Sequence, residues 1–299
     1  MDGVLLLDKP AGMTSHDCVA KVRRLLKTKK VGHTGTLDPS VTGVLPLCIG
    51  RATKLSQFLT ADAKEYIAEV TIGFSTTTED ADGEKVFEQL PEKPLTKEEA
   101  EAAVASLIGT SLQTPPMYSA VKIKGKKLYE YARAGIEVER PSREITIYGA
   151  ALLSDVASNA DGTYKFSFSV KGSKGLYVRT VATTLGEKLG YPAHMSKLRR
   201  TASGRFQIKD CLSLAQLEAL ASSQEGVPLI PMETALEGMP KLEASPWIEK
   251  LVRNGVALAP EQAVGQEGQF AVYSGAGQLL AVYDRHPEKE LFVSVRGFF

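Results

Sequence analysis

Apolar and polar residues alternate over several stretches of this chain, a pattern typical of half-buried β-strands. The clearest case is residues 65–73, where Tyr66, Ala68, Val70 and Ile72 would share one face of a strand. Further strands are predicted at residues 3–7, 117–124, 143–154, 163–171 and 194–207. A chain with this many alternating stretches is expected to build a large sheet.

Other stretches repeat their apolar residues at helical spacing. In residues 16–27, Val19, Val22 and Leu26 recur three and four positions apart, and Ser15 is a candidate N-cap. Further helices are predicted at residues 53–59, 97–107 (preceded by a capping box at 96–99), 127–134 and 177–189.

The order of these elements indicates the fold class. A turn at residues 159–162 would join two long strands as a hairpin, and no regular βαβ alternation occurs. This pattern predicts an α+β domain around a mostly antiparallel or mixed sheet. After residue 240, prolines and glycines separate short strands near 269–273, 278–283 and 291–296. We therefore expect two domains, residues 1–240 and a small β-rich module at residues 241–299.

Composition narrows the class of protein. The chain has 299 residues, of which 43% are hydrophobic and 24% charged, as in ordinary globular proteins. It contains no apolar run near the roughly 18 residues that span a bilayer, and its first residues do not resemble a signal peptide. Cys18, Cys48 and Cys211 form no CxxC pair. These features argue against a zinc site or disulfide framework and predict a cytoplasmic protein.

Charge is segregated along the chain, although the net charge is only +1. Residues 21–30 carry six basic side chains and no acid, and residues 171–209 carry nine basic side chains against Glu187 alone. Residues 79–101 instead hold nine acids against three lysines. Two acid-poor segments predict a face for a polyanion. For residues 21–30 alone, a solvated helix face is the competing interpretation.

The segment at residues 31–39, VGHTGTLDP, is the strongest candidate for chemistry. Its small residues allow a ligand to approach the main chain closely, and Asp38 is placed where such a loop would present it. An Asp-Pro turn is the simpler alternative. The chain has no GxxxxGK[ST] loop, no dinucleotide-binding fingerprint and no cluster with metal-ligand spacing, so neither a cofactor nor a metal is expected.

Six blocks of sequence together resemble the bacterial tRNA pseudouridine-55 synthases of the TruB type. They occur in that family's order, and the GHTGTLDP block is highly specific in this company. The blocks lie at residues 3–15, 32–39, 64–66, 115–122, 175–180 and 198–201.

The resemblance implies conversion of the uridine at position 55 in the tRNA T-loop to pseudouridine. The N1–C1′ bond breaks and a C5–C1′ bond forms, which needs neither redox chemistry nor hydrolysis. Asp38 matches the family's catalytic carboxylate, and a carboxylate with a pKa of ~3.9 is ionised at neutral pH. Three routes stay open: attack on the sugar, attack on C6 of the base, or proton removal to give a glycal.

The resemblance also assigns roles to other residues. The target base must be flipped out of its stack, and His33 is expected to occupy the vacated place. Tyr66 matches the aromatic residue that stacks on the flipped base. Without the resemblance, core packing on the face with Val70 and Ile72 is a strong alternative, and Tyr66 could serve both purposes. Arg179 matches the arginine that pairs with the catalytic aspartate. Tyr177 and Leu198 match the pocket for the base.

Basic residues complete the set of candidates. Lys9 would either contact phosphate or support the catalytic loop. Arg199 and Arg200, together with Lys197, are candidate phosphate contacts, with a solvated strand end as the alternative. The module at residues 241–299 resembles the PUA-type RNA-binding domain that follows this catalytic domain.

The expected partner is the T-stem-loop of tRNA, bound by a monomer that needs no protein partner and no membrane. Two other functions remain possible from the sequence: a tRNA-folding chaperone, and a guide-RNA-dependent pseudouridine synthase subunit. The former would keep its function without Asp38, whereas the latter would need a guide RNA or further proteins.

Overall fold

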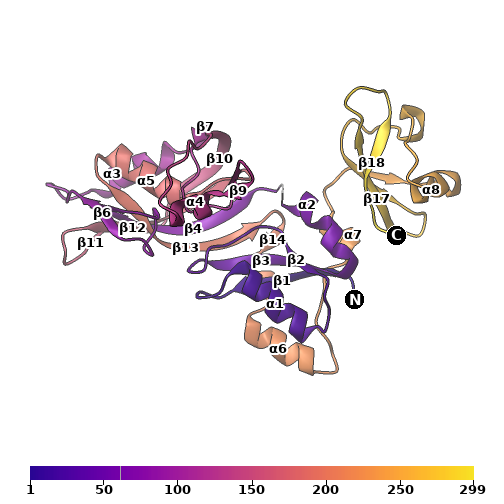
Figure 1. The fold of residues 1–299 in the computed structure, drawn as a ribbon, viewed down its shortest axis with the longest axis horizontal. Coiled ribbons are helices and arrows are strands. Elements are labelled where there is room, and N and C mark those ends of the chain that lie inside the picture. The colour runs from indigo at the N-terminus through magenta and orange to yellow at the C-terminus, as the bar shows by residue number, and fades with distance from the viewer. Residues whose placement is uncertain (61) are drawn as a thin grey trace.

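A ten-stranded mixed sheet forms the centre of the protein in a computed structural model, which describes residues 1–60 and 62–299 (Figure 1). Its main path runs β1-β3-β13-β4-β12-β10-β7, and β2, β11 and β14 pair beside it. Neighbouring strands in the described ranges are antiparallel except β13 and β3. The strands are β1 (Gly3–Lys9), β2 (Val31–His33), β3 (Thr42–Ile49), β4 (Lys64–Ile72), β7 (Gly109–Gln113), β10 (Arg143–Leu152), β11 (Ala157–Ser158), β12 (Tyr164–Gly172), β13 (Ala193–Ser203) and β14 (Phe206–Gln207). The predicted α+β class with a mostly antiparallel mixed sheet is confirmed.

The helices cover two parts of this sheet. In Figure 1, α3 and α5 lie over the part that contains β10 and β12, whereas α1 and α6 lie beside β1, β2 and β3. The helices are α1 (Ser15–Leu25), α2 (Ser56–Leu59), α3 (Lys97–Ala105), α4 (Leu128–Arg133), α5 (Val178–Leu189), α6 (Leu214–Ser222), α7 (Met232–Ala235) and α8 (Pro246–Arg253), with 3-10 turns at Gly50–Leu55, Ile208–Asp210 and Pro260–Gln262. One core lies between α3, α5 and the sheet, and it contains Tyr66 and Leu37.

The first helix begins one residue earlier than predicted and ends sooner. Thr14, rather than Ser15, is the N-cap, and it forms a capping box with Asp17. Ser15 instead exchanges hydrogen bonds with the backbone of Leu37, to which its hydroxyl donates at 3.2 Å and from which it accepts at 2.9 Å. The helix ends at Leu25 because Lys27 adopts a left-handed backbone conformation, φ 50°. Ser15 therefore ties α1 to the loop that carries Asp38.

The strand predicted at residues 117–124 is wrong. Only Lys122–Ile123 forms a strand, β8, and it pairs with β9 (Lys126–Lys127). The preceding Pro115 and Pro116 have no N–H to donate to a ladder, and the carbonyl of Tyr118 accepts a hydrogen bond from a side chain instead. The predicted strand at 194–207 is a hairpin, since Gly204 turns the chain between β13 and β14.

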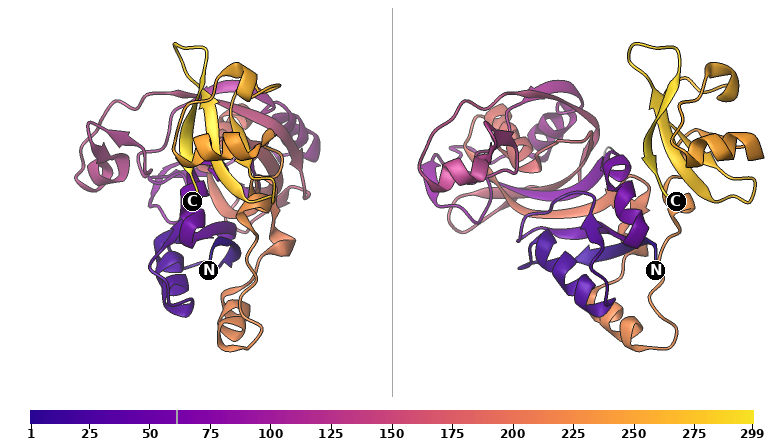
Figure 2. Two further views of the ribbon diagram at one scale, coloured as in Figure 1. Left: turned by 90° about the vertical axis from the view of Figure 1, so that its right-hand side faces the viewer. Right: turned by 45° about the vertical axis from the view of Figure 1, so that its right-hand side comes forward.

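The C-terminal strands form a second sheet, as predicted, in the order β15-β16-β17-β18. These are β15 (Lys241–Glu243), β16 (Phe270–Tyr273), β17 (Leu279–Arg285) and β18 (Phe292–Gly297), and a further hairpin joins β5 (Phe74–Thr76) to β6 (Lys85–Glu88). Figure 2 shows the second sheet beside α2 and away from most of the large sheet. Phe298 links the two, because it is fully buried and packs against Phe58 of α2.

Candidate active site

Asp38 lies on an irregular loop that joins β2 to β3. The two strands are antiparallel neighbours, with His33 opposite Leu47, so the loop between them projects from the sheet. Backbone hydrogen bonds fix it: the Thr34 N–H donates to Pro46 O at 3.2 Å, and the Val41 N–H donates to Asp38 O at 3.1 Å. Hydrogen bonds to β3 and within the loop therefore fix its conformation.

Lys9 supports this loop from inside the protein. Its side chain is 0% exposed, and its ammonium group donates to the carbonyls of Pro10 (2.9 Å), Pro39 (3.1 Å) and Val41 (2.7 Å). Burial lowers the pKa of Lys9, which Asp38 partly counteracts. All three N–H donors are used, so none is free for a substrate phosphate in this arrangement. The sequence left two roles open for Lys9, contact with phosphate and support of the loop, and these contacts support the loop.

Arg200 also lies behind the loop. It is 2% exposed, and its guanidinium donates to Val44 O at 2.7 Å and to Gly35 O at 3.3 Å. The Tyr66 hydroxyl lies beside the same group. Arg199 is placed differently, since its side chain is 41% exposed and pairs with Asp8 at 2.7 Å. Of the two arginines, only Arg199 is positioned at the surface where phosphate would reach it.

The Asp38 carboxylate pairs with a buried arginine. Arg179 Nη2 lies 3.2 Å from Asp38 Oδ2, and Arg179 Nη1 lies 3.7 Å from Asp80 Oδ2. The same guanidinium donates to Thr78 O at 3.1 Å and to Tyr118 O at 2.8 Å. Arg179 is thus held from several sides, and it fixes the orientation of Asp38. The structure brings together Asp38 and Arg179, which the sequence predicted as partners.

Asp80 is a site residue that the sequence did not single out. It lies in the acidic turn predicted at residues 79–83, which is typical of a solvated loop. In the structure, Asp80 is 7% exposed, its Oδ1 accepts from the Thr78 hydroxyl and the Asp82 N–H, and Asp82 accepts from Ser40 at 2.8 Å. The only available signal was the concentration of acids directly before a glycine, which does not reveal a distant arginine.

The pKa of Asp38 is raised above the usual carboxyl value. Removal from water is the main cause; the positive charge of Arg179 opposes it, and the negative charges of Asp80 and Asp82 reinforce it. The side chain nevertheless keeps 41% of its surface exposed, whereas that of Arg179 keeps 6%. The carboxylate is therefore accessible to a substrate on one side and electrostatically controlled on the other.

His33 is poised to be neutral. Burial lowers its pKa, and the charges of His16 and Arg200 act in the same direction. Its Nδ1 accepts a hydrogen bond from the Gly35 N–H at 3.3 Å, which leaves the proton of the neutral ring on Nε2. The ring meets His16 edge-on, with 5.4 Å between centroids. A flat, uncharged ring at the base of the Asp38 loop fits the role predicted for His33.

Tyr66, Leu198 and Tyr177 come from three neighbouring elements. Tyr66 is 8% exposed on the predicted inner face of β4, and Leu198 pairs with Ala68 from β13. Tyr177 precedes α5, where its backbone exchanges hydrogen bonds with the Gln113 side chain at 2.8 and 3.1 Å. Burial raises the pKa of the Tyr177 hydroxyl, so it stays protonated. Both strands contact α5, the helix that carries Arg179.

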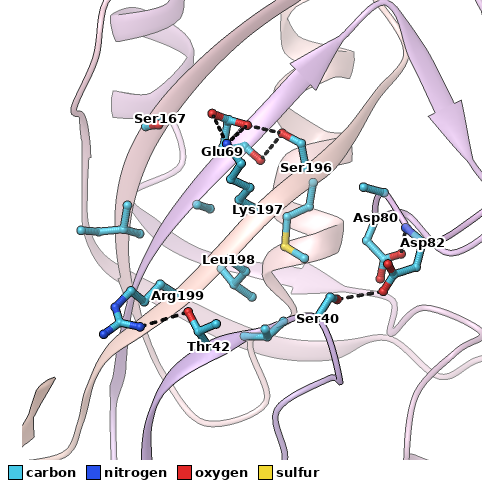
Figure 3. Close-up of a pocket in the computed structure, with 15 residues that line it drawn as sticks. Ser40, Thr42, Glu69, Asp80, Asp82, Ser167, Ser196, Lys197, Leu198 and Arg199 are labelled. Atoms are coloured by element: carbon cyan, nitrogen blue, oxygen red, sulfur yellow. Dashed lines mark hydrogen bonds and ion pairs between the residues drawn. The ribbon is translucent and has the colours of Figure 1, made fainter. Parts of the chain in front are cut away.

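A cavity of about 510 Å³ opens beside the Asp38 loop (Figure 3). It lies along the edge of β13 that faces away from β4, between Met195, which pairs with Asp80, and Arg199, which pairs with Thr42. Figure 3 shows Leu198 in the middle of the lining residues, with Arg199 on one side and Ser40, bonded to Asp82, on the other. The cavity is large enough for a nucleotide-sized group.

A second hollow, of about 500 Å³, is lined almost wholly by basic side chains. It lies at the C-terminal end of α1, where Arg23, Arg24, Lys27 and Lys29 are exposed around Thr28. No carboxylate lines it. We call these residues the α1 basic hollow.

Two family models match consecutive parts of this chain. The TruB family pseudouridylate synthase profile (N-terminal domain) matches residues 23–178, and the tRNA pseudouridylate synthase B C-terminal domain profile matches residues 179–237. The chain belongs to the TruB family of pseudouridylate synthases. It is therefore an enzyme of the isomerase class, which confirms the resemblance of its sequence blocks.

Known relatives agree over nearly the whole length. The tRNA pseudouridine synthase B of Geobacillus thermodenitrificans is 54% identical over 291 residues, covering 97% of this chain and 96% of the relative. That of Bacillus subtilis is 54% identical over 296 residues, covering 97% and 95%. A chain in the crystal structure of a Cbf5–Nop10–Gar1 complex is similar with a TM-score of 0.75 at 27% identity, covering 99% of this chain and 85% of that one.

Two further properties concern the described residues. None of their helices is long and apolar enough to cross a membrane. Within residues 1–60 and 62–299, no group of three or more His, Cys, Asp or Glu side chains could hold a metal ion.

Proposed function

We propose that this enzyme converts uridine 55 in the T-loop of tRNA to pseudouridine, with Asp38 as the reacting carboxylate. The observation that carries the proposal is the pairing of a half-exposed Asp38 with a buried Arg179 on the GHTGTLDP loop. The names of the Geobacillus and Bacillus relatives support tRNA as the substrate class.

The reaction needs one carboxylate as its reacting group. The N1–C1′ bond of the nucleotide breaks, a C5–C1′ bond forms, and the hydrogen on C5 is released while N1 gains one. Asp38 in its ionised form acts as nucleophile or base, and Arg179 favours that form because it lowers the pKa of Asp38. Three routes use the same Asp38 carboxylate: attack on C1′ of the sugar, attack on C6 of the base, or removal of a ribose proton to give a glycal.

The target base must leave the folded RNA loop before it meets Asp38. Flipping costs a few kcal/mol, and a protein side chain that fills the vacated stack lowers this cost. Neutral His33 is suited to that position because an uncharged ring costs little to bury. The Tyr66 ring would stack on the flipped base, an interaction worth ~1–3 kcal/mol, and Leu198 and Tyr177 would line its other sides.

Basic surface beside the site would bind the RNA backbone. Arg199 lies at the margin of the large cavity, and the α1 basic hollow lies on the helix that Ser15 ties to the Asp38 loop. We assign catalysis to residues 1–240 and a PUA-like RNA-binding role to residues 241–299. The enzyme would act in the cytoplasm as a monomer, without a protein partner.

A second candidate is a guide-RNA-dependent subunit. The observation behind it is that a similar chain, at 27% identity, occurs in a complex with further components, Cbf5–Nop10–Gar1. The test is to incubate the purified chain alone with an isolated T-stem-loop transcript. Pseudouridine does not change RNA mass, so the product is detected by chemical derivatisation followed by mass spectrometry. We expect stoichiometric modification at position 55. Modification only after addition of guide RNA or further proteins would support the second candidate instead.

A further inference from the structure

Glu79 has an unusual backbone conformation next to the catalytic pair. Its φ is 63°, in the left-handed region that residues with a Cβ rarely adopt. Strained residues of this kind persist only where the surroundings over-determine them, and they cluster at functional sites. The contacts around Glu79 show what this conformation achieves.

The residues on either side of Glu79 both contact Arg179. Thr78 presents its carbonyl to Arg179 Nη1 at 3.1 Å, and Asp80 presents Oδ2 to the same nitrogen at 3.7 Å. The backbone must reverse between them to aim a carbonyl and a carboxylate at one guanidinium. The left-handed Glu79 provides this reversal.

Glu79 is tied to two elements outside its own turn. The Thr180 hydroxyl donates to Glu79 Oε2 at 2.8 Å, and the Met195 N–H of β13 donates to Glu79 O at 3.0 Å. Thr180 directly follows Arg179 in the first turn of α5. The same helical turn thus supplies both the arginine that the Asp80 turn contacts and the hydroxyl that fastens this turn.

We propose that Glu79 and Thr180 form a clasp that positions Asp80 and Thr78 against Arg179, and through it orients Asp38. Both are positioning residues, because neither contacts the Asp38 carboxylate. This inference rests on the proposed function. It goes beyond that function because it attributes the orientation of the Arg179–Asp38 pair to a contact between two neighbouring residues. Glu79 directly precedes Asp80, and Thr180 directly follows Arg179.

The test compares variants by single-turnover rate at saturating enzyme and by tRNA affinity. Thr180→Val removes the donor at nearly constant shape, and Glu79→Ala removes the acceptor while keeping the Cβ that strains the left-handed backbone. We expect each to slow turnover about tenfold or more, since small misplacements of catalytic groups cost up to about a hundredfold. Affinity for the T-stem-loop should stay within about twofold, because neither Glu79 nor Thr180 lines the large cavity or the α1 basic hollow.

Conservative variants separate the hydrogen bond from general packing. Thr180→Ser keeps the donor and Glu79→Gln keeps an acceptor, so both should restore most of the rate. Glu79→Gly keeps the left-handed backbone without the side chain and should fall between wild type and Glu79→Ala. The matched control is Thr183→Val, which removes a threonine hydrogen bond to Thr180 O on the same helix but leaves the clasp intact. Its rate should match wild type.

A double-mutant cycle decides whether the clasp works through Asp80. In an Asp80→Asn background, Thr180→Val should slow turnover little further, because the interaction that it positions is already weakened. Fully additive effects would overturn the inference, as would a wild-type rate for Thr180→Val. If Thr180→Val fails to fold, Glu79→Gly and Glu79→Gln give the same comparison.

The two proposals fail in different ways. If the unsubstituted enzyme leaves the T-stem-loop unmodified, the proposed function fails first. If it modifies the RNA and Thr180→Val does so equally fast, only the clasp fails. The pH profile adds a readout that a purely structural role would not move. Because the Asp80 charge raises the pKa of Asp38, a clasp variant that lets Asp80 move away should shift the acid limb of the rate toward lower pH.

Discussion

Arg179 holds the Asp38 carboxylate from a buried position, with 3.2 Å between Nη2 and Oδ2. The guanidinium is fixed by the Tyr118 and Thr78 carbonyls and by Asp80, so it has little freedom to follow a moving partner. This rigidity makes Asp38 the adjustable member of the pair. Its pKa is then set by its surroundings: burial and Asp80 raise it, and Arg179 lowers it.

The opposed effects of Arg179 and Asp80 predict opposed shifts in the pH dependence of turnover. Asp80→Asn removes a charge that raises the pKa of Asp38. Asp38 should therefore stay ionised down to a lower pH, and the residual activity should persist to the same lower pH. Arg179→Gln removes the charge that lowers this pKa, so the acid limb should move to higher pH. Single-turnover rates across pH measure both limbs. Glu101→Gln, on the exposed side of α3, is the control and should leave the limb in place.

Shifts in the same direction for Asp80→Asn and Arg179→Gln would contradict this electrostatic description of the site. Both variants should also turn over more slowly at every pH, because each loosens the contact that orients Asp38.

Lys9 is predicted to act on stability rather than on RNA binding. Lys9→Met leaves the carbonyls of Pro10, Pro39 and Val41 without their buried donor, which should lower the free energy of unfolding by about 1–3 kcal/mol. Denaturant titration measures this change. The dependence of tRNA affinity on salt should keep its slope, because Lys9 contacts no solvent-exposed anion.

The α1 basic hollow provides the comparison for Lys9. Arg24→Ala and Lys27→Ala should each reduce the slope of log affinity against log salt by about 1 for every phosphate that the substituted side chain neutralises, with little effect on stability. Lys93→Ala, at a separate groove beside α3, serves as the control. A reduced slope for Lys9→Met together with an unchanged slope for the hollow variants would reverse these assignments.

Tyr66 tests stacking against hydroxyl chemistry. Tyr66→Phe keeps the ring and removes the hydroxyl beside Arg200, whereas Tyr66→Ala removes the stacking surface as well. We expect the single-turnover rate to fall far more in the alanine variant than in the phenylalanine variant. Equal decreases would instead implicate the hydroxyl in the reaction.

The alternating pattern predicted strands well but not every side-chain direction. Tyr66 lies on the inner face of β4 as predicted, because that strand alternates without interruption. On β13 the pairing register shifts between Met195 and Lys197, which resets the alternation downstream. Arg200 therefore points inward and Arg199 outward, a difference that the sequence of two adjacent arginines does not reveal.

The Asp38 loop and the Asp80 turn differ in how far the sequence predicted them. The loop carries a specific motif, which predicted Asp38 and His33, and a separate block at residues 175–180 predicted Arg179. The turn has only local acidity, which is typical of solvated loops. Its role depends on Arg179, 99 positions further along the chain, and no local pattern records such a contact.

The most direct measurement is the activity of Asp38→Asn on the isolated T-stem-loop. Asparagine keeps the shape of the side chain and cannot act as nucleophile or base, so no pseudouridine should form even after prolonged incubation at saturating enzyme. Affinity for the RNA should stay within about threefold, since a single carboxylate contributes no phosphate contact. Pseudouridine formed by the pure Asp38→Asn protein would contradict the assignment of Asp38 as the reacting group.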